Sequence, residues 1–285
     1  MPSMDLSFYK LRLCDSDLIL IDDLSGGGKG RDWARAAREM LQRRRGVGAD
    51  RFAVISKPEG EIWLRVFLAN GEEAPLADAA LCAARYLLDS GRSSADSVTL
   101  RVSGIDPSGG FLQVDVLDSA SLGIALGPPL GMPGGEVLDA EAAGSRAASV
   151  ETSGERFQVL PLRAGVPAAD AAAVFANGGA ARARARIGSS KKELSLSAVA
   201  VRVASRGELI VSAPTGGKLD SCAAAAVALA ASAALGYSDR EAVVRLGKGA
   251  MWAEWMEGGS LYAAGRPEYV YRGEYHLNEE DYASK

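Results

Sequence analysis

Histidine and cysteine are scarce in this chain of 285 residues, and their scarcity narrows the chemistry it can perform. The single histidine, His276, lies in a polar segment near the end of the sequence, so a Ser-His-Asp or Cys-His site would have to be built around that one residue. The three cysteines, Cys14, Cys82 and Cys222, show no CxxC spacing, which predicts neither a disulfide framework nor a zinc site. No acidic loop has the spacing of a calcium site. We therefore expect no metal.

Long apolar runs and a strong charge of one sign are missing as well. The most apolar run, Ala223–Leu235, is too short to span a bilayer, and the first residues lack the features of a signal peptide. We therefore expect a cytoplasmic protein with no membrane segment. The net charge of −4 argues against nucleic acid as a partner. The composition, 48% hydrophobic and 24% charged, is that of a globular protein, and the length favours two domains.

Hydrophobic periodicity predicts three helices among many strands. Apolar residues at spacings of three and four predict a helix over Asp32–Arg45, with arginines on its other face. Two alanine-rich helices are predicted at Leu76–Leu88 and Lys218–Leu229, and they contain Cys82 and Cys222 in their first turns. Because helices that are apolar nearly all round need burial, we expect two similar lobes, each with one helix inside a curved sheet. Strands are predicted at 17–22, 51–56, 62–67, 97–102, 111–117, 157–162, 196–204, 209–212, 260–264 and 268–272.

Two segments rich in glycine are predicted to be connections. Ser25–Gly30 contains four glycines and a lysine but lacks the Gly-Lys-Ser/Thr ending of a phosphate-binding loop, which favours a flexible linker. Leu126–Gly135 combines glycine with proline and is expected to join the two lobes.

A series of short motifs follows one another along nearly the full chain. They are Phe8–Leu11 with Asp17–Asp22, Gly46–Asp50, Arg65–Gly71, Cys82–Tyr86, Gly127–Pro129, Gly258–Leu261 and Gly265–Glu274. In their order and spacing they resemble the motifs of the diaminopimelate epimerase family.

The resemblance implies an α/β (α+β) fold of two pseudo-symmetric lobes, each a mostly antiparallel sheet wrapped round a central helix. The lobes are expected at 1–125 plus 262–285 and at 126–261. The active site is expected in the cleft between lobes, where two helix N-termini offer N–H groups to a carboxylate.

The resemblance also implies a reaction, and this chain departs from it. The family inverts an α-carbon without a cofactor, with one cysteine thiolate as the base and a second thiol as the acid on the opposite face. The position of the first thiol falls on Leu76 or Ala77 here, and that of the second falls on Gly217. Cys82 and Cys222 match cysteines inside the family's helices and are expected to be small buried core residues.

The positions that hold the family's substrate have changed as well. Ser16 and Leu68 stand where the family has asparagines, Val166 replaces the asparagine of a Gly-Asn-Pro-His motif, and Ser212–Pro214 replaces a Glu-Arg-Gly motif. Because these contacts and both thiols are missing, we do not expect the two-thiol epimerisation of diaminopimelate. Backbone N–H groups of a glycine turn do not depend on the lost side chains. The ligand-binding positions predicted to remain are Ser16, Asn70, Thr215, Gly216 and Gly217.

Two functions therefore stay open. The first is a non-catalytic relative, which binds a small carboxylate or amino acid in the cleft or serves as a partner protein. The second is a cofactor-independent isomerase or epimerase of such a compound that uses acid/base groups other than two cysteines. Its candidate groups are Asp78, Lys218 and Asp220, in the first turns of the central helices, although an aspartate there also suits the helix dipole. Glu72 and Glu73 are similar candidates.

A third and weaker hypothesis is a polyanion-binding surface. It combines the arginines of Asp32–Arg45 with the basic residues at 182–192 and predicts binding that weakens with salt. The acidic overall balance opposes it. The sequence leaves open whether the chain forms a homodimer.

Overall fold

A computed structural model describes residues 4–74, 76–102, 110–130, 139–140, 145–146, 148–152, 155–162, 196–212 and 219–277. The chain forms two compact units, Met1–Leu122 with Pro267–Lys285, and Gly123–Arg266. The residues from Pro267 onward thus group with the N-terminal unit.

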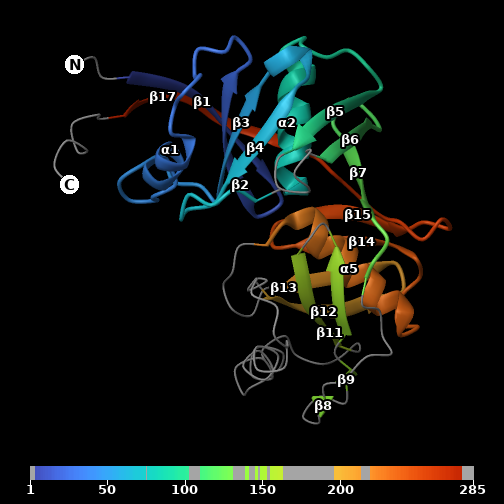
Figure 1. The fold of residues 1–285 in the computed structure, drawn as a ribbon. Helices are drawn as coiled ribbons and strands as arrows, with labels where there is room; N and C mark the ends of the chain where they lie inside the picture. The colour runs from blue at the N-terminus through green and yellow to red at the C-terminus, as the bar shows by residue number, and fades with distance from the viewer. Residues whose placement is uncertain are drawn as a thin grey trace. The chain divides into compact units, whose positions relative to one another are not determined.

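The first unit is built on one curved sheet with the strand order β6-β5-β4-β3-β2-β1-β17 (Figure 1). Neighbouring strands are antiparallel except for two parallel pairs, β2 with β3 and β4 with β5. The strands are β1 (Met4–Leu13), β2 (Ser16–Asp23), β3 (Arg51–Ser56), β4 (Trp63–Phe67), β5 (Ser97–Val102), β6 (Gly110–Val116) and β17 (Glu268–Leu277), with a short 3₁₀ turn η1 (Pro58–Gly60) between β3 and β4.

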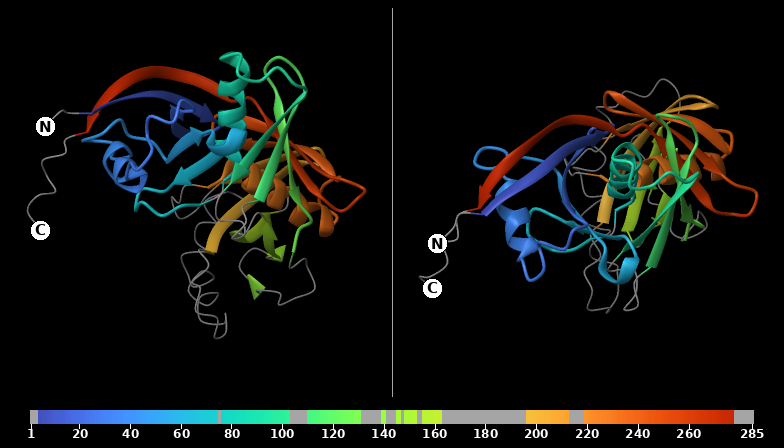
Figure 2. Two further views of the ribbon diagram at one scale, coloured as in Figure 1. Left: turned by 45° about the horizontal axis from the view of Figure 1, so that its top comes forward. Right: turned by 90° about the horizontal axis from the view of Figure 1, so that it is seen from above.

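Two helices pack on this sheet. Helix α1 (Trp33–Met40) packs its apolar stripe on a core cluster that includes Ile19, Ile21 and Phe52. Helix α2 (Ala77–Asp89) contacts strands from β6 across to β1 and lies inside the curve of the sheet (Figures 1 and 2). Because strand side chains alternate between faces, the residues between those of the α1 cluster are available to cover α2.

Helix α1 is shorter than the sequence predicts. The expected helix reached Arg45, whereas α1 ends at Met40, and this expectation is therefore wrong in its second half. The chain turns back because the N–H of Gly48 donates to the carbonyl of Met40 at 2.8 Å. Gly46 permits the turn, since a Cβ at that position would clash with the carbonyl oxygen of Glu39. The apolar residues of the predicted helix end at Leu41, and two close backbone approaches turn the chain there.

An ion-pair network ties the turn after α1 to the sheet. Arg43 bridges the carboxylates of Asp17 and Asp50 at 2.9 and 2.6 Å, and Lys10 reaches Asp17 at 3.0 Å. Burial raises the pKa of Asp17, but its contacts with Asp50, Lys10 and Arg43 outweigh burial and lower that pKa to about 2. Both aspartates come from motifs that carried the resemblance, and here they connect β2 to the glycine turn before β3.

The second unit repeats the plan of the first. Its sheet has the order β10-β11-β12-β13-β14-β15-β16-β7, and the parallel pairs are β11 with β12 and β13 with β14. Helix α5 (Ser221–Ala234) contacts every strand from β10 to β16 and is buried nearly all round. The strands are β7 (Leu122–Gly127), β10 (Ala148–Thr152), β11 (Glu155–Leu162), β12 (Leu196–Ser205), β13 (Glu208–Ser212), β14 (Glu241–Leu246), β15 (Gly249–Trp255) and β16 (Leu261–Gly265), beside a short pair, β8 (Asp139–Ala140) with β9 (Ser145–Arg146).

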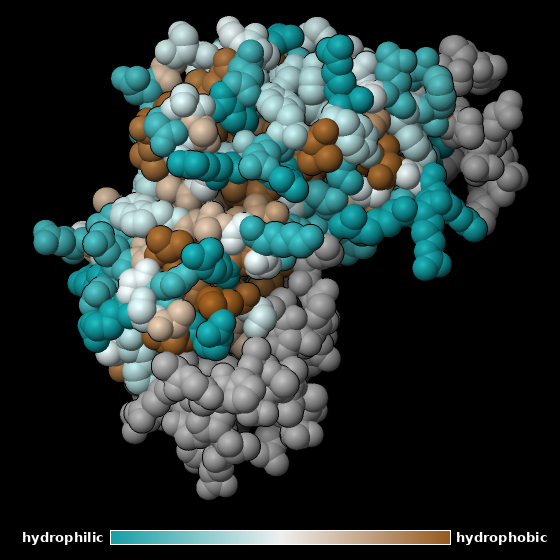
Figure 3. Space-filling view, turned by 180° about the vertical axis from the view of Figure 1, so that it is seen from behind, coloured by the Kyte–Doolittle hydropathy of each residue, from teal (hydrophilic) through white to brown (hydrophobic). Residues whose placement is uncertain are grey.

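The repeated pattern confirms the expected fold class. In each unit the pairings run antiparallel, parallel, antiparallel, parallel and antiparallel, from β1 to β6 and from β10 to β15. The central helix follows the fourth strand each time, α2 after β4 and α5 after β13. On the face in Figure 3, hydrophobic residues of both units gather in small patches among hydrophilic ones. No helix within the described ranges is long and apolar enough to cross a membrane.

Candidate functional site

The two central helices begin in the same way, which fixes the correspondence between their residues. The N-cap of α2 is Leu76 and that of α5 is Asp220, and both have extended backbone angles. Each cap carbonyl accepts a hydrogen bond from the N–H group four residues later, at 3.3 Å in α2 and 2.9 Å in α5. Counted from these caps, Asp78 and Cys222 are each the second residue of their helix.

In this register the two cysteines occupy different positions of their helices. Cys82 is the sixth residue of α2 and corresponds to Ala226, whereas Cys222 lies in the first turn of α5. The predicted start of the second helix at Lys218 is wrong, because α5 begins at Ser221. The expected burial of both thiols is confirmed, with exposed fractions of 2% and 0%. An aspartate before an apolar run is a helix-start signal, and Asp220 could have given the correct register.

The two helix starts differ in how they are capped. The carboxylate of Asp220 accepts the N–H of Ala223 at 2.8 Å and is buried. Leu76 makes no side-chain cap, and an acid follows two residues later at Asp78, which is also buried. Each helix therefore has its own aspartate at its positive end, where a negative charge is stabilised.

A cluster of acids surrounds the thiol of Cys14 in the first unit. Cys14 lies in the turn between β1 and β2 with a φ of 55°, a conformation that few residues other than glycine adopt. Burial, followed by the charges of Asp15, Asp78 and Glu268, raises the pKa of this thiol to about 12. The turn between β1 and β2, the first turn of α2 and the start of β17 therefore come together. At neutral pH the Cys14 thiol is protonated, so it can donate a proton but cannot act as a base. No motif in the sequence marks Cys14, so it was not predicted as a site residue.

The remaining predicted residues of the first unit fall in two places. Ser16 is half-buried at the start of β2, two residues after Cys14. Asn70 is exposed in the turn after β4, where its amide donates to the Glu72 carboxylate at 2.6 Å and accepts the Glu72 N–H at 2.9 Å. Glu73 pairs with an arginine of β4 at 2.7 Å. These contacts shape the β4–α2 connection, and Ser16 is the predicted position that lies beside the acid cluster.

A pocket with aromatic walls lies beside α2. Its volume is about 330 Å³. The hydroxyl of Tyr86 donates to Asp22 at 2.6 Å, and the ring of Tyr86 lies 4.7 Å from that of Tyr9. Burial and the nearby Asp22 raise the pKa of Tyr86, so this hydroxyl is no base at neutral pH. The pocket is lined by Tyr9, Tyr86, Asp89, Ser90, Tyr269, Tyr271 and Arg272.

Several expectations concern positions outside the described residues. These are Val166, the basic residues at 182–192 and the turn with its flanking lysine, Thr215, Gly216, Gly217 and Lys218.

Comparisons with known proteins find relatives named as epimerases. No protein-family model matches it. Curated diaminopimelate epimerases from Pelotomaculum thermopropionicum and Caldanaerobacter subterraneus subsp. tengcongensis are 26% and 23% identical over 95% and 94% of the chain, and 99% of each relative is covered. The expected resemblance to the diaminopimelate epimerase family is thereby confirmed.

Solved structures show the same fold. A predicted epimerase from Pseudomonas aeruginosa superposes with a TM-score of 0.66 at 16% identity, covering 96% of this chain and 100% of that one. A PhzF-family phenazine biosynthesis protein from Enterococcus faecalis gives 0.64 at 14% identity, with 96% and 100% covered. A hydroxyproline epimerase from Agrobacterium vitis, solved with trans-4-hydroxy-L-proline, gives 0.64 at 13% identity, with 97% and 94% covered.

Proposed function

We propose that this chain is a cofactor-independent isomerase or epimerase that moves a proton on the carbon next to a carboxylate, with Asp78 and Cys222 as its proton-transfer groups. Its substrate class is a small amino acid or related carboxylic acid. One observation carries the proposal: the two units place a group able to exchange a proton at the same position of corresponding helices.

The cap correspondence brings a thiol near the second family position. It pairs Leu76, one of the two residues to which the first family thiol was assigned, with Asp220, and Cys222 lies two residues after Asp220. In the first unit the corresponding position is the apolar Leu76, and the nearest titratable side chain in α2 is Asp78.

The start of a helix suits this chemistry. Its N–H groups and partial positive charge stabilise a thiolate or a carboxylate, and they also stabilise the negative charge that develops on a substrate carboxylate as its α-proton leaves. In the forward reaction the Asp78 carboxylate takes the proton from carbon, and the Cys222 thiol returns one. The enzyme is left with a protonated aspartate and a thiolate, and exchange with solvent resets both.

The test is deuterium exchange at carbon. The protein is incubated in D₂O with a panel that includes diaminopimelate, trans-4-hydroxy-L-proline and both enantiomers of the common amino acids, and loss of the α-proton NMR signal is followed. We expect exchange with at least one compound. Removing either proton-transfer group should reduce the rate by roughly 10²–10⁴.

Two cysteines give a matched control. Cys222→Ala and Cys82→Ala each remove one buried thiol from a central helix, but only the first removes a group at a helix start. Cys222→Ala and Asp78→Asn should slow exchange by that factor, and Cys82→Ala should retain the wild-type rate. The folding of all three variants is checked by circular dichroism. Equal rates in the two alanine variants would exclude Cys222 from the chemistry.

A non-catalytic ligand-binding protein is the second candidate, and the caps favour it. The Asp220 carboxylate already accepts an N–H group of α5, and the side chain of Leu76 is apolar. Neither cap side chain therefore offers a substrate the charged or hydrogen-bonding partner expected in a catalytic pocket. This candidate predicts that a carboxylate or amino acid raises the melting temperature while no compound of the panel exchanges its α-proton. Analytical ultracentrifugation would test the homodimer.

A further inference from the structure

The aromatic pocket beside α2 takes no part in the proposed reaction. Its α2 residues, Tyr86, Asp89 and Ser90, lie at the end of the helix, whereas Asp78 lies in the first turn. With a rise of about 1.5 Å per residue, Asp78 and Ser90 are about 18 Å apart along the helix. Every lining residue belongs to the first unit. The volume of about 330 Å³ is at the small end of the range of small-molecule sites.

A β-bulge in β17 builds one wall of this pocket. Tyr269 lies opposite Leu11 of β1, and Arg272 lies opposite Tyr9, because the register shifts by one residue between the two pairs. Residues three apart in a regular strand point to opposite faces, whereas their partners in β1 are two apart and share a face. The bulge therefore turns Tyr269 and Arg272 to one face of the sheet. On this face Tyr9 contacts Tyr86 of α2.

Three tyrosine rings form a row along the pocket. The ring of Tyr9 lies 4.7 Å from that of Tyr86 and 6.4 Å from that of Tyr269. Tyr86 is held at the inner end, because its hydroxyl donates to Asp22 at 2.6 Å and Asp22 also pairs with Arg92 at 3.0 Å. Tyr269 is 42% exposed at the outer end. These spacings are those of attractive aromatic pairs, so the ring of a ligand in the pocket would extend the row.

Arg272 supplies the charge that a ligand would meet. The other charged residue of the lining, Asp89, is paired with Arg85 through both of its carboxylate oxygens. Among the residues that the structure describes, no side chain forms an ion pair or a hydrogen bond with Arg272. The lining therefore presents one unpaired guanidinium beside a row of rings. A guanidinium binds a carboxylate through two parallel hydrogen bonds.

We propose that this pocket binds a small aromatic carboxylic acid, with Arg272 as the ligand of the carboxylate and with Tyr9 and Tyr269 as the surface for the ring. One positive charge matches a carboxylate better than it matches a phosphate dianion. The proposal is independent of the isomerase hypothesis, because it uses none of the residues at the starts of α2 and α5.

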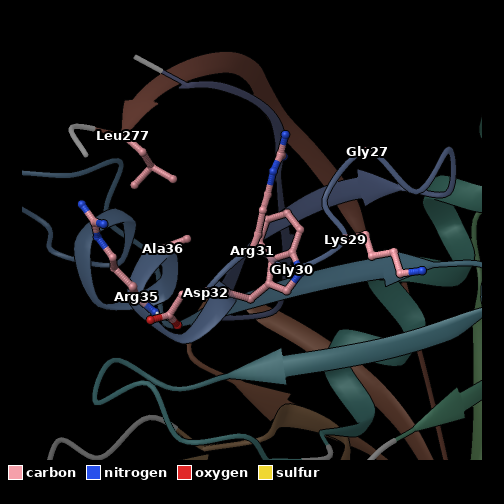
Figure 4. A pocket seen from close by; sticks show the side chains of 9 residues that line it. Gly27, Lys29, Gly30, Arg31, Asp32, Arg35, Ala36 and Leu277 are labelled. Carbon is pink, nitrogen blue, oxygen red and sulfur yellow. Dashed lines mark hydrogen bonds between the residues drawn. The ribbon is translucent and has the colours of Figure 1, made fainter. Parts of the chain in front are cut away.

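A second cavity of the same unit provides an internal control. It has a volume of about 380 Å³ and lies beside the start of α1 (Figure 4). The one aromatic residue of its lining is Trp33, which is buried and has the Arg31 guanidinium 5.6 Å from the centre of its ring. This cavity therefore offers a ligand no row of exposed rings, and we expect it not to compete for an aromatic acid.

The glycine-rich loop that lines the second cavity is fixed in place. The N–H of Gly28 donates to the buried Asp23 at 2.6 Å. A Cβ on Gly28 would clash with the Trp33 ring, so only glycine allows this packing. The loop is consequently anchored at its centre and differs from the flexible linker that the sequence predicted. Because the anchor does not involve Arg31, replacing Arg31 should leave the loop unchanged.

The experiment is a titration of the full-length protein with benzoate and with phenylacetate, followed by ligand-observed NMR or calorimetry. We expect saturable binding that Arg272→Ala weakens roughly tenfold or more. Tyr269→Ala should weaken it roughly two- to tenfold, and Tyr269→Phe, which keeps the ring, should weaken it less. Arg31→Ala, which removes an arginine from the second cavity, should leave binding unchanged.

Matched ligands separate the ring from the charge. Benzamide keeps the ring without the charge, and cyclohexanecarboxylate keeps the charge without the aromatic ring. Both should bind more weakly than benzoate, and equal binding of either would overturn the assignment of an aromatic acid. Tighter binding of benzylamine would indicate a cation site and overturn it as well.

Two results would overturn the site itself. One is benzoate binding that is unchanged in Arg272→Ala, and the other is no saturable binding of either acid. Cys222→Ala should retain benzoate binding, which keeps this test separate from that of the isomerase.

Discussion

Replacing Asp220 tests the register on which the correspondence of the two units depends. If Asp220 is the N-cap of α5, Asp220→Ala removes the acceptor for the Ala223 N–H and leaves that donor buried. Asp220→Asn keeps an acceptor of the same shape and removes only the charge. Asparagine and aspartate are similarly good caps, so the two variants separate the hydrogen bond from the charge.

The magnitude follows from the surroundings of the cap. Loss of an N-cap hydrogen bond costs about 1 kcal/mol, and loss of a partly buried charge at the helix start adds up to about 1 kcal/mol. We expect Asp220→Ala to lower the free energy of unfolding by about 1–2 kcal/mol and Asp220→Asn by about 0.5–1 kcal/mol. Asp32 caps the half-exposed α1 through the same bond to Arg35, at 3.0 Å. Water can replace that acceptor, so Asp32→Ala should cost about 0.5 kcal/mol.

The assay is equilibrium unfolding in urea, with tryptophan fluorescence and circular dichroism followed together. The expected order of stability is wild type, Asp32→Ala, then Asp220→Ala, with Asp220→Asn above Asp220→Ala. An Asp220→Ala variant as stable as the wild type would show that α5 does not start at Ser221. The assignment of Cys222 to the first turn would then lose its basis.

Three further predictions concern the first unit. With a pKa of about 12, the Cys14 thiol should react with iodoacetamide at pH 8 at least about a hundredfold more slowly in the folded protein than in the urea-unfolded chain. The rates are measured by peptide mass spectrometry, and fast labelling of the folded protein would show that burial and the nearby acids do not raise this pKa. Asp17→Asn should lower the free energy of unfolding by about 1 kcal/mol at pH 7, after allowance for the partial exposure of Asp17. Because the pKa of Asp17 is lowered to about 2, the difference in stability between variant and wild type should fade as pH falls from about 4 to 2. A difference that persists at pH 2 would show that it does not come from the charge of Asp17. Gly28→Ala should destabilise by about 1–3 kcal/mol by displacing Trp33, and Gly27→Ala, with open space around it, should be neutral; equal thermal shifts would contradict the loop packing.

Motifs predicted more of the fold than periodicity did. The strands at Arg51–Ser56 and Ser97–Val102 match their predicted bounds, because glycine turns and charged residues delimit them in the sequence. The class of fold came from the order of short motifs along the chain, and Asp50 shows why they persist: its side chain is buried in an ion-pair network that connects separate elements. Such residues are constrained by folding, so they mark a fold independently of the groups that perform the chemistry.

Two parts of the structure were not predicted, for different reasons. The strands β14 (Glu241–Leu246) and β15 (Gly249–Trp255) were missed, although they form a local hairpin and β14 alternates buried and exposed residues in the manner of a sheet with one covered face. The acid cluster near Cys14 joins three segments, and the last of them, at Glu268, is more than 250 positions away in sequence. No spacing in the sequence brings these groups together; the pairing of β17 with β1 does.

The unlike groups at the two helix starts have an energetic consequence for the proposed reaction. A carboxylic acid is a much stronger acid than a thiol, so the step that leaves a protonated aspartate and a thiolate is uphill in free energy. Two identical groups carry no such term. Asp78→Cys makes the pair alike, so it should speed exchange of a substrate that is converted to its mirror image. The same variant should accelerate to a smaller extent the conversion of a substrate to a more stable product, because the stability of that product already offsets the uphill proton transfer. For each of the two kinds of substrate, the exchange rate in Asp78→Cys is divided by the rate in the wild type. If the variant slows both substrates equally, Asp78 takes no part in the proton-transfer step.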